Sequence, residues 1–153
     1  MAYCSAADVK TYLGISGAGD DTLLGKLIER AQKAIDSYTQ RTFEASADTS
    51  RTFDTERDVD GPTLWLDEDL CSITTITNGD GTEVTAIEYT TEPRNRTPYF
   101  AIRLLSSANI IWETDTTNYD HEDSITVEGR WAYSTSAPAD IVHACIRLAS
   151  YYY

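Results

Sequence analysis

Five residues in the middle of the chain have the spacing of a calcium-binding loop. Carboxylates recur at alternate positions in Glu56, Asp58 and Asp60, Gly61 follows where such a loop bends, and Asp67 stands eleven residues after Glu56. Calcium takes oxygen ligands in this arrangement. However, a proline follows the glycine, and the flanking residues have the pattern of strands, whereas a loop of this class joins two helices. The sequence therefore favours a solvated acidic turn, and neither a metal nor another cofactor is predicted.

The two histidines are the residues best suited to acid–base catalysis. His121 lies in a polar, acidic segment and His143 lies on the last expected helix. Neither has a serine or cysteine at the spacing of a nucleophilic motif. The 25 Asp and Glu residues are dispersed, so some pair will approach closely without being a glycosidase site. No catalytic residue is predicted, and we do not expect an enzyme.

Aromatic residues on the expected strands have two interpretations. Trp65, Trp112, Trp131 and Tyr133 fit the core of a β-sheet, because large aromatic side chains dominate the energetics of such cores. If their rings were exposed, they could instead anchor a protein interface or bind carbohydrate. A calcium-dependent or carbohydrate-binding β-domain of a virion or surface protein is therefore the alternative function.

The charge of the chain limits its partners. Twelve Lys and Arg residues against 25 Asp and Glu residues give a net charge of −13 and a pI near 4.3. Because the acidic residues are dispersed, they indicate an acidic folded surface, which repels nucleic acid. Arg94 and Arg96 form an isolated basic pair rather than a nucleic-acid-binding patch.

Cysteine usage and hydropathy bear on the compartment. Cys4, Cys71 and Cys145 are an odd number at wide spacing, which predicts reduced thiols in a reducing compartment rather than a disulfide framework. The first residues lack the basic and long apolar parts of a secretory signal, and no apolar run has the length of a transmembrane helix. No membrane partner is expected.

Two helices are predicted within the first 43 residues. Ser5 can cap the first, Asp8 lies in its first turn, and Gly14 can end it. The second, between residues 20 and 43, has an apolar stripe at three- and four-residue steps. That stripe consists of Leu24, Leu27, Ile28, Ala31, Ala34, Ile35 and Tyr38.

The middle of the chain predicts strands. Residues 51–133 are rich in Thr, Ile, Val, Trp and Tyr and are divided by turn signals. Residues 78–81 read Asn-Gly-Asp-Gly and predict a hairpin turn, because both dipeptides tolerate positive φ. The expected strands are residues 51–54, 63–66, 72–77, 83–90, 99–105, 109–113 and 124–133.

A third helix is predicted at the end of the chain. Pro138 and Asp140 suit its first turn. Its expected buried stripe consists of Ile141, Cys145, Leu148 and Tyr152.

The last residues of this helix are the candidate partner interface. Successive helical residues are turned by about 100°, so Tyr151, Tyr152 and Tyr153 cannot all face the core. We expect these three tyrosines and Arg147 to contact a partner. No capping residue follows them, so the helix end is expected to be covered by further chain or by another molecule.

Together these elements predict an α+β fold in a single domain, residues 1–153. The N-terminal helices (residues 1–43) and the C-terminal helix (residues 136–153) are expected to pack together. The β-rich region, residues 51–133, is expected as an insertion between them.

The order of these motifs resembles the head–tail connector proteins (adaptor or head completion proteins) of tailed bacteriophages, over the whole chain. The matching segments are residues 7–15, 20–31, 35–43, 64–66, 73–76, 80–81, 125–133, 138–141 and 144–149. They include the helical patterns, the strand that alternates up to Tyr133, and the start of the last helix.

The resemblance implies an assembly role rather than catalysis. Such proteins form a ring beneath the phage portal, usually dodecameric, which extends the DNA channel and receives a downstream stopper or tail protein. The expected partners are therefore further copies of the chain, the portal and that neck component, while packaged DNA passes without specific binding. The expected location is the virion neck, after assembly in the host cytoplasm.

Overall fold

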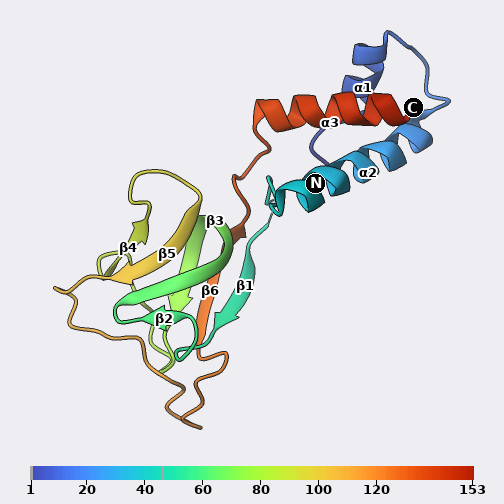
Figure 1. Cartoon of the computed structure of the whole chain (residues 1–153). Helices are drawn as coiled ribbons and strands as arrows, with labels where there is room; N and C mark the ends of the chain where they lie inside the picture. The colour runs from blue at the N-terminus through green and yellow to red at the C-terminus, as the bar shows by residue number, and fades with distance from the viewer. Residues whose placement is uncertain (1, 46) are drawn as a thin grey trace. The chain divides into compact units, whose positions relative to one another are not determined.

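The computed structural model describes residues 2–45 and 47–153. The chain divides into two compact units. The helical unit comprises Met1–Glu44 and Ser136–Tyr153, and the sheet unit comprises Ala45–Thr135. The chain therefore leaves the helical unit once, forms the sheet unit, and returns (Figure 1).

The helical unit contains α1 (Ala6–Leu13), α2 (Asp21–Thr39) and α3 (Ala139–Tyr152). The predicted cap of α1 is confirmed as a capping box: the Asp8 N–H donates to the Ser5 hydroxyl at 3.2 Å, and the Ser5 N–H donates to the Asp8 carboxylate at 2.8 Å. Gly14 ends the helix at φ +69°, a conformation that favours glycine. These local signals fix where α1 begins and ends.

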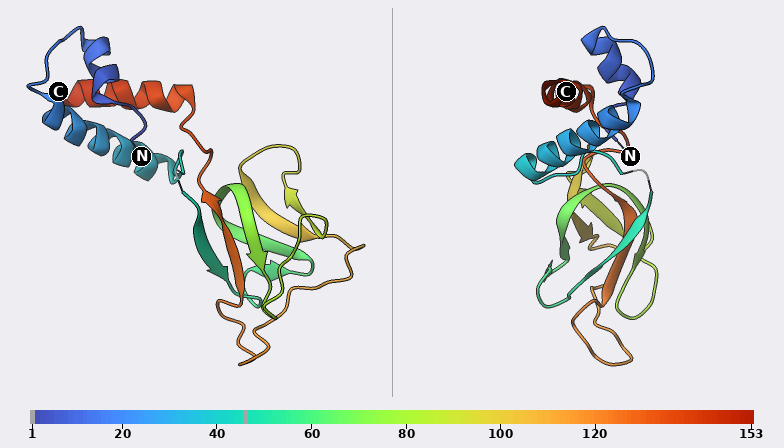
Figure 2. Two further views of the ribbon diagram at one scale, coloured as in Figure 1. Left: turned by 180° about the vertical axis from the view of Figure 1, so that it is seen from behind. Right: turned by 90° about the vertical axis from the view of Figure 1, so that its right-hand side faces the viewer.

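Small buried residues bring the helices together. α3 lies beside α2 (Figure 2), and its buried positions are Cys145 and Ala149. The buried residues of α2 include Ala31 and Ile28. The Ile28 carbonyl oxygen lies 4.0 Å from the Cys145 sulfur. The distance between packed helices depends on the side chains at their contact, so these small residues permit a close approach. The predicted α3 stripe is therefore centred on Cys145, while Ile141, Leu148 and Tyr152 are only half-buried.

Tyr3 fastens the N-terminal segment to α2 and to the segment after it. Its hydroxyl donates to Asp36 at 2.5 Å and accepts from the Phe43 N–H at 2.8 Å. Burial, followed by the bond to Asp36, raises the Tyr3 pKa, so the hydroxyl keeps its proton. The rings of Tyr3 and Phe43 also meet edge to face, at 6.2 Å between centroids.

Among its described residues, the sheet unit contains six antiparallel strands: β1 (Thr49–Phe53), β2 (Val59–Asp60), β3 (Thr63–Thr77), β4 (Tyr89–Glu92), β5 (Tyr99–Leu104) and β6 (Ile125–Trp131). Their order is β1-β6-β3-β5-β4, and β2 pairs with β3. The first part of β3 pairs with β5 and its last part with β6, with register shifts between them. β3 thus bends, and the sheet curls around one core.

That core is built from alternating side chains of the strands. Ile125, Val127 and Trp131 of β6 are buried, together with Leu64 of β3 and Ile102 of β5. Between them on β6, Gly129 lies so close to the Ser72 carbonyl of β3 that a Cβ atom would collide with it. Glycine is therefore needed where the two strands approach.

Several sequence-based assignments need correction. Residues 63–66 and 72–77 belong to the single strand β3, because its bulges interrupt the alternation. Residues 109–113 form no strand, and residues 83–90 contribute a bridge at Glu83 and the start of β4. The turn at residues 78–81 is confirmed: the Gly81 N–H donates to the Asn78 carbonyl at 2.9 Å.

The predicted fold class is wrong. We expected an α+β domain of N- and C-terminal helices packed together, with the β-rich region as an insertion. Instead, the chain is sheet-dominant: three short helices lie at its two ends, and the six-stranded antiparallel sheet forms the larger unit. Helical periodicity is continuous and easily seen, whereas a bulged strand loses its period of two. The sequence-based prediction of the fold class therefore overestimated the share of the helices and underestimated that of the sheet.

Candidate partner-binding surfaces

The three tyrosines at the end of α3 have different surroundings. The Arg30 guanidinium lies 4.5 Å from the centre of the Tyr152 ring, which is half-buried. The Tyr153 hydroxyl donates to Asp20 at 3.0 Å. Tyr151 is 84% exposed, and its ring lies 6.1 Å from that of the neighbouring Tyr152. Tyr152 and Tyr153 are thus held by the helical unit, and Tyr151 projects from it.

Tyr151 continues a solvent-exposed face of the helical unit. His143, Arg147 and Tyr151 follow one another at four-residue spacing along α3, and all three are exposed. Tyr12 of α1 meets His143 edge to face, at 6.2 Å between ring centroids, and is 53% exposed. We call Tyr12, His143, Arg147 and Tyr151 the α3 outer face. It combines aromatic rings with one cation, the composition that dominates protein-binding energy.

The charge of the chain is divided unequally between the two units. The helical unit has seven Asp and Glu residues against six Lys and Arg residues, a net charge of −1. The sheet unit has 18 against six, a net charge of −12. The acidity of the chain is therefore a property of the sheet unit, and the helical unit can approach another acidic protein without strong repulsion.

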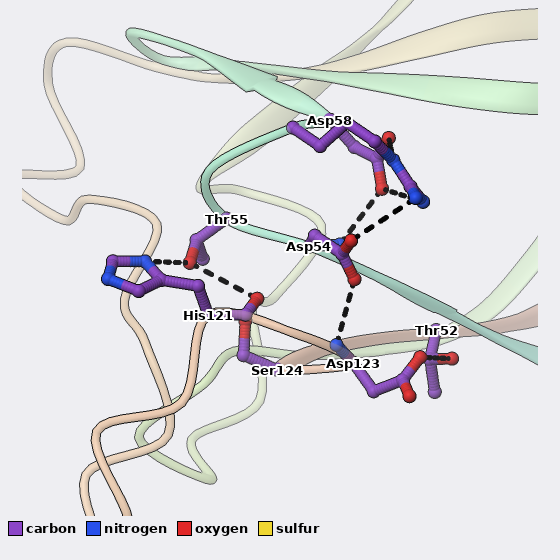
Figure 3. A network of polar contacts seen from close by, with 8 residues as sticks. Thr52, Asp54, Thr55, Asp58, His121, Asp123 and Ser124 are labelled. Atoms are coloured by element: carbon purple, nitrogen blue, oxygen red, sulfur yellow. Dashed lines mark hydrogen bonds and ion pairs between the residues drawn. The ribbon is translucent and has the colours of Figure 1, made fainter.

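A polar network fixes one end of the sheet unit (Figure 3). The Asp54 N–H donates to the Asp58 carboxylate at 2.9 Å, and the Asp123 N–H donates to the Asp54 carboxylate at 3.0 Å. Arg57 pairs with Asp58 at 3.0 Å and Asp54 at 3.4 Å. Partial burial raises the Asp58 pKa, but hydrogen bonds from Arg57 and Asp54 outweigh it, and the net shift is downward. These carboxylates therefore stabilise the turn that follows β1.

His121 belongs to the same network. Its carbonyl accepts from the Thr55 N–H at 3.0 Å and from the Ser124 hydroxyl at 3.1 Å, and its Nδ1 lies 3.1 Å from the Thr55 hydroxyl. The histidine thereby joins the turn after β1 to the segment before β6. His143 lies on α3, in the other unit. The structure does not bring the two histidines together within one unit.

The structure separates the four residues that the calcium-loop spacing grouped. Glu56 and Asp60 are exposed, Asp58 caps its own turn, and Asp67 pairs with Arg51 of β1 at 2.9 Å. Across residues 2–45 and 47–153, no three His, Cys, Asp or Glu side chains are grouped so that they could hold a metal ion.

The tryptophans divide between the core and the surface. Trp112 and Trp131 are buried, and each ring N–H donates to a backbone carbonyl at 3.0 Å, of Pro62 and Thr49 respectively. Trp65 of β3 is 49% exposed and stacks on Phe100 of β5, at 6.2 Å and 11° between the rings. Trp65 and Phe100 therefore form an aromatic pair on the outside of the sheet.

A recess of about 450 Å³ opens where β3 ends. The buried Asn78 holds its walls together, because its amide donates to the Ile111 carbonyl at 2.8 Å and accepts from the Glu113 N–H at 2.9 Å. The lining residues are Asn78, Asp80, Thr82, Glu83, Val84, Glu88, Asn109, Ile110, Ile111 and Glu113. The lining thus contains four carboxylates and no cation.

Comparison with known protein families identifies the family of the chain. The family model described as head completion protein matches residues 2–153. This chain belongs to the head completion protein family. No curated protein matches the sequence closely enough to count as a relative.

Membership in the head completion protein family confirms the family resemblance found in the sequence. The chain is a structural protein of the phage virion, and it acts in the assembly or completion of the phage head. None of the helices among the described residues has the length and apolar character that a membrane span requires.

Sequence reasoning missed three features of this head completion protein. The Trp65–Phe100 pair arises only from the pairing of β3 with β5, and the acidic recess only from the contact of the turn after β3 with residues 109–113, and neither has a local sequence motif. The unequal charge of the two units could have been found by counting Asp, Glu, Lys and Arg on either side of residues 45 and 135.

Proposed function

We propose that copies of this head completion protein form a ring beneath the portal, extend the DNA channel, and receive a stopper or tail protein. Head-to-tail contacts between identical subunits close into a ring when their rotation permits. The ring holds the chain in the virion neck. The isolated chain is expected to be monomeric at low concentration and to assemble on the head.

The helical unit is the portal-docking part of this proposal, and the exposure of Tyr151 is the observation that carries it. Tyr151 is 84% exposed, although the next two tyrosines along the chain contact Arg30 and Asp20 respectively. Exposed aromatic rings next to arginine are the residues that most often dominate binding energy. The small net charge of this unit keeps long-range repulsion low.

The sheet unit is the part best suited to face the passing DNA or its neighbours. With 18 acidic residues against six arginines, its field repels phosphate groups. A channel that repels DNA allows the duplex to slide without being held. We therefore expect no binding of duplex DNA by the purified chain at physiological salt.

Binding to purified portal tests the docking proposal. Tyr151→Ala should weaken portal binding about thirtyfold, which corresponds to about 2 kcal/mol for an aromatic anchor. The matched control is Tyr119→Ala, because Tyr119 is similarly exposed, at 78%, but lies in the sheet unit. Equal affinities of the two variants and the unsubstituted chain would place the docking surface elsewhere.

A further inference from the structure

The acidic recess at the end of β3 has both the negative groups and the apolar surface that suit a cationic side chain. Asp80, Glu83, Glu88 and Glu113 line it, and Val84 and Ile110 supply apolar surface between them. An arginine fits such a site, because its methylene stem packs on apolar surface while its guanidinium pairs with carboxylates. Ile111, which also lines the recess, is 69% exposed and offers further apolar surface to such a stem.

The carboxylates of the recess take part in no ion pair among the described residues, and two of them have lowered pKa values. Hydrogen bonds from Thr82 lower the pKa of Asp80, and those from Thr85 lower the pKa of Glu88. These donors are uncharged, at 2.7 to 2.9 Å. None of the ion pairs found among the described residues includes a carboxylate of the recess. Within the described part of the chain, no ion pair therefore compensates the negative charge of the recess.

Three arginines of the same unit have no acidic partner among the described residues: Arg103, which lies on β5, and Arg94 and Arg96, which share one loop. The sheet unit has six cations, all arginines. Arg51, Arg57 and Arg130 form ion pairs with neighbouring carboxylates. Arg94 and Arg96 are exposed in the loop between β4 and β5 and take part in no ion pair among the described residues. Pro93 and Pro98 flank this loop and restrict its backbone, so less entropy is lost when it binds.

The loop and the recess lie at opposite ends of the sheet unit. β5 begins directly after the loop and ends at Leu104, and the Leu105 N–H donates to the Glu88 carbonyl at 2.8 Å. The six residues of β5 span roughly 20 Å at about 3.3 Å per residue. Figures 1 and 2 show the β4–β5 loop at one end of the sheet and the turn after β3 at the other. Arg94 and Arg96 therefore cannot reach the recess of their own chain.

We propose that the recess of one copy receives Arg94 and Arg96 of the next copy. The contact joins two different surfaces, so that each copy gives its loop to one neighbour and accepts a loop from the other, as a ring requires. The contact also offsets part of the repulsion between sheet units that each have a net charge of −12, because opposite charges meet at the point of contact. This inference rests on the proposed ring and names its subunit interface.

Charge reversal on each side of the contact tests the inference. The loop variant is Arg94→Glu with Arg96→Glu, and the recess variant is Glu83→Arg with Glu113→Arg. Each full-length variant is expressed during infection by phage whose own copy is disrupted, and the copies incorporated per particle are counted. We expect each variant alone to be incorporated at least about tenfold less than the unsubstituted chain. Expressed together, the two variants restore alternating complementary contacts and should restore incorporation.

Controls separate this interface from folding and from the ring itself. Glu56→Arg with Glu122→Arg makes the same charge change at exposed positions outside the recess and should leave incorporation unchanged. Circular dichroism and thermal unfolding confirm that each variant is folded. Normal incorporation of either reversed variant alone, or no rescue by the mixture of folded variants, would overturn the interface while leaving the ring proposal intact. A single unsubstituted copy per particle would overturn both.

Discussion

The sulfur atoms of Cys4 and Cys145 lie 3.6 Å apart in the interior of the helical unit, although 141 positions separate them in the sequence. Cys4 precedes α1 and Cys145 lies in the middle of α3, so the two ends of the chain meet at this pair. Burial raises the pKa of both thiols, that of Cys145 to about 12. The helical unit is therefore built for two protonated thiols.

This pair predicts that the helical unit loses stability in alkali. The unfolded thiols titrate near pH 9.0 and the folded Cys145 near 12, so the folded state binds more protons between these values. Stability is fully present below about pH 9 and falls as the pH rises toward 12, by up to about 1.4 kcal/mol per pH unit for one group. Urea unfolding followed by helical circular dichroism at pH 8, 9 and 10 measures this slope. Cys145→Ala should lower stability at pH 8 but flatten the slope; an unchanged slope would mean that other groups cause it.

The neighbouring tyrosines of α3 should differ in their effect on stability. Tyr152→Ala removes a half-buried ring and its cation–π contact with Arg30, and we expect a loss of about 1–2 kcal/mol. Tyr151→Ala removes an exposed ring and should change the free energy of unfolding by no more than about 0.5 kcal/mol. Chemical denaturation of both variants makes the comparison. Similar losses would show that Tyr151 has a structural role, and would weaken its use as a docking residue.

Alanine substitutions at two glycines should change the free energy of unfolding in opposite directions. Gly129→Ala forces a Cβ atom into the Ser72 backbone and should cost the sheet unit more than about 2 kcal/mol through strand displacement. Gly25 lies within α2 with open space around its Cα, so Gly25→Ala should stabilise the helical unit by about 0.5–1 kcal/mol. Thermal unfolding of the two variants tests both signs. A neutral Gly129→Ala would mean that β3 and β6 can separate there without loss.

The predictable parts of this fold were those fixed by neighbouring residues. Ser5, Asp8 and Gly14 determine the ends of α1 by local hydrogen bonding, and the Asn-Gly pair at residue 78 marks its turn, so both were found in the sequence. The bent strand β3 was divided in two, because its bulges depend on pairing with β5 and β6. The acidic recess depends on another long-range contact, the hydrogen bonds that join Asn78 to Ile111 and Glu113. Helix geometry predicted that the last three tyrosines point in different directions. It could not predict which of them is exposed, because that depends on the contacts of Tyr152 with Arg30 and of Tyr153 with Asp20.

Calcium should not contribute to the stability of this protein. A specific site would raise the free energy of unfolding by about 2.7 kcal/mol at a hundredfold excess over Kd. The carboxylates of Asp58 and Asp67 are instead bonded to Arg57 and Arg51. Unfolding in calcium and in chelator should therefore give the same midpoint. A shift of that size, abolished by Asp58→Ala, would establish a calcium site and support the alternative of a calcium-dependent β-domain.

The carbohydrate alternative can be tested at the Trp65–Phe100 pair on the outside of the sheet. Trp65 and Phe100 are stacked and about half exposed, and such a pair suits a protein contact as well as a sugar ring. We expect Trp65→Ala to leave a glycan-array profile unchanged, with no bound glycan before or after the substitution. A glycan bound by the unsubstituted chain and lost in Trp65→Ala would favour carbohydrate recognition.

The most direct test of the account is the number and arrangement of copies in the virion. An electron cryomicroscopy reconstruction of the neck, calculated without imposed symmetry, measures both. We expect several copies in one head-to-tail ring around the DNA path, with the α3 outer face of each copy against the head-side neighbour. One copy per particle, or a two-fold dimer away from the DNA path, would contradict the ring.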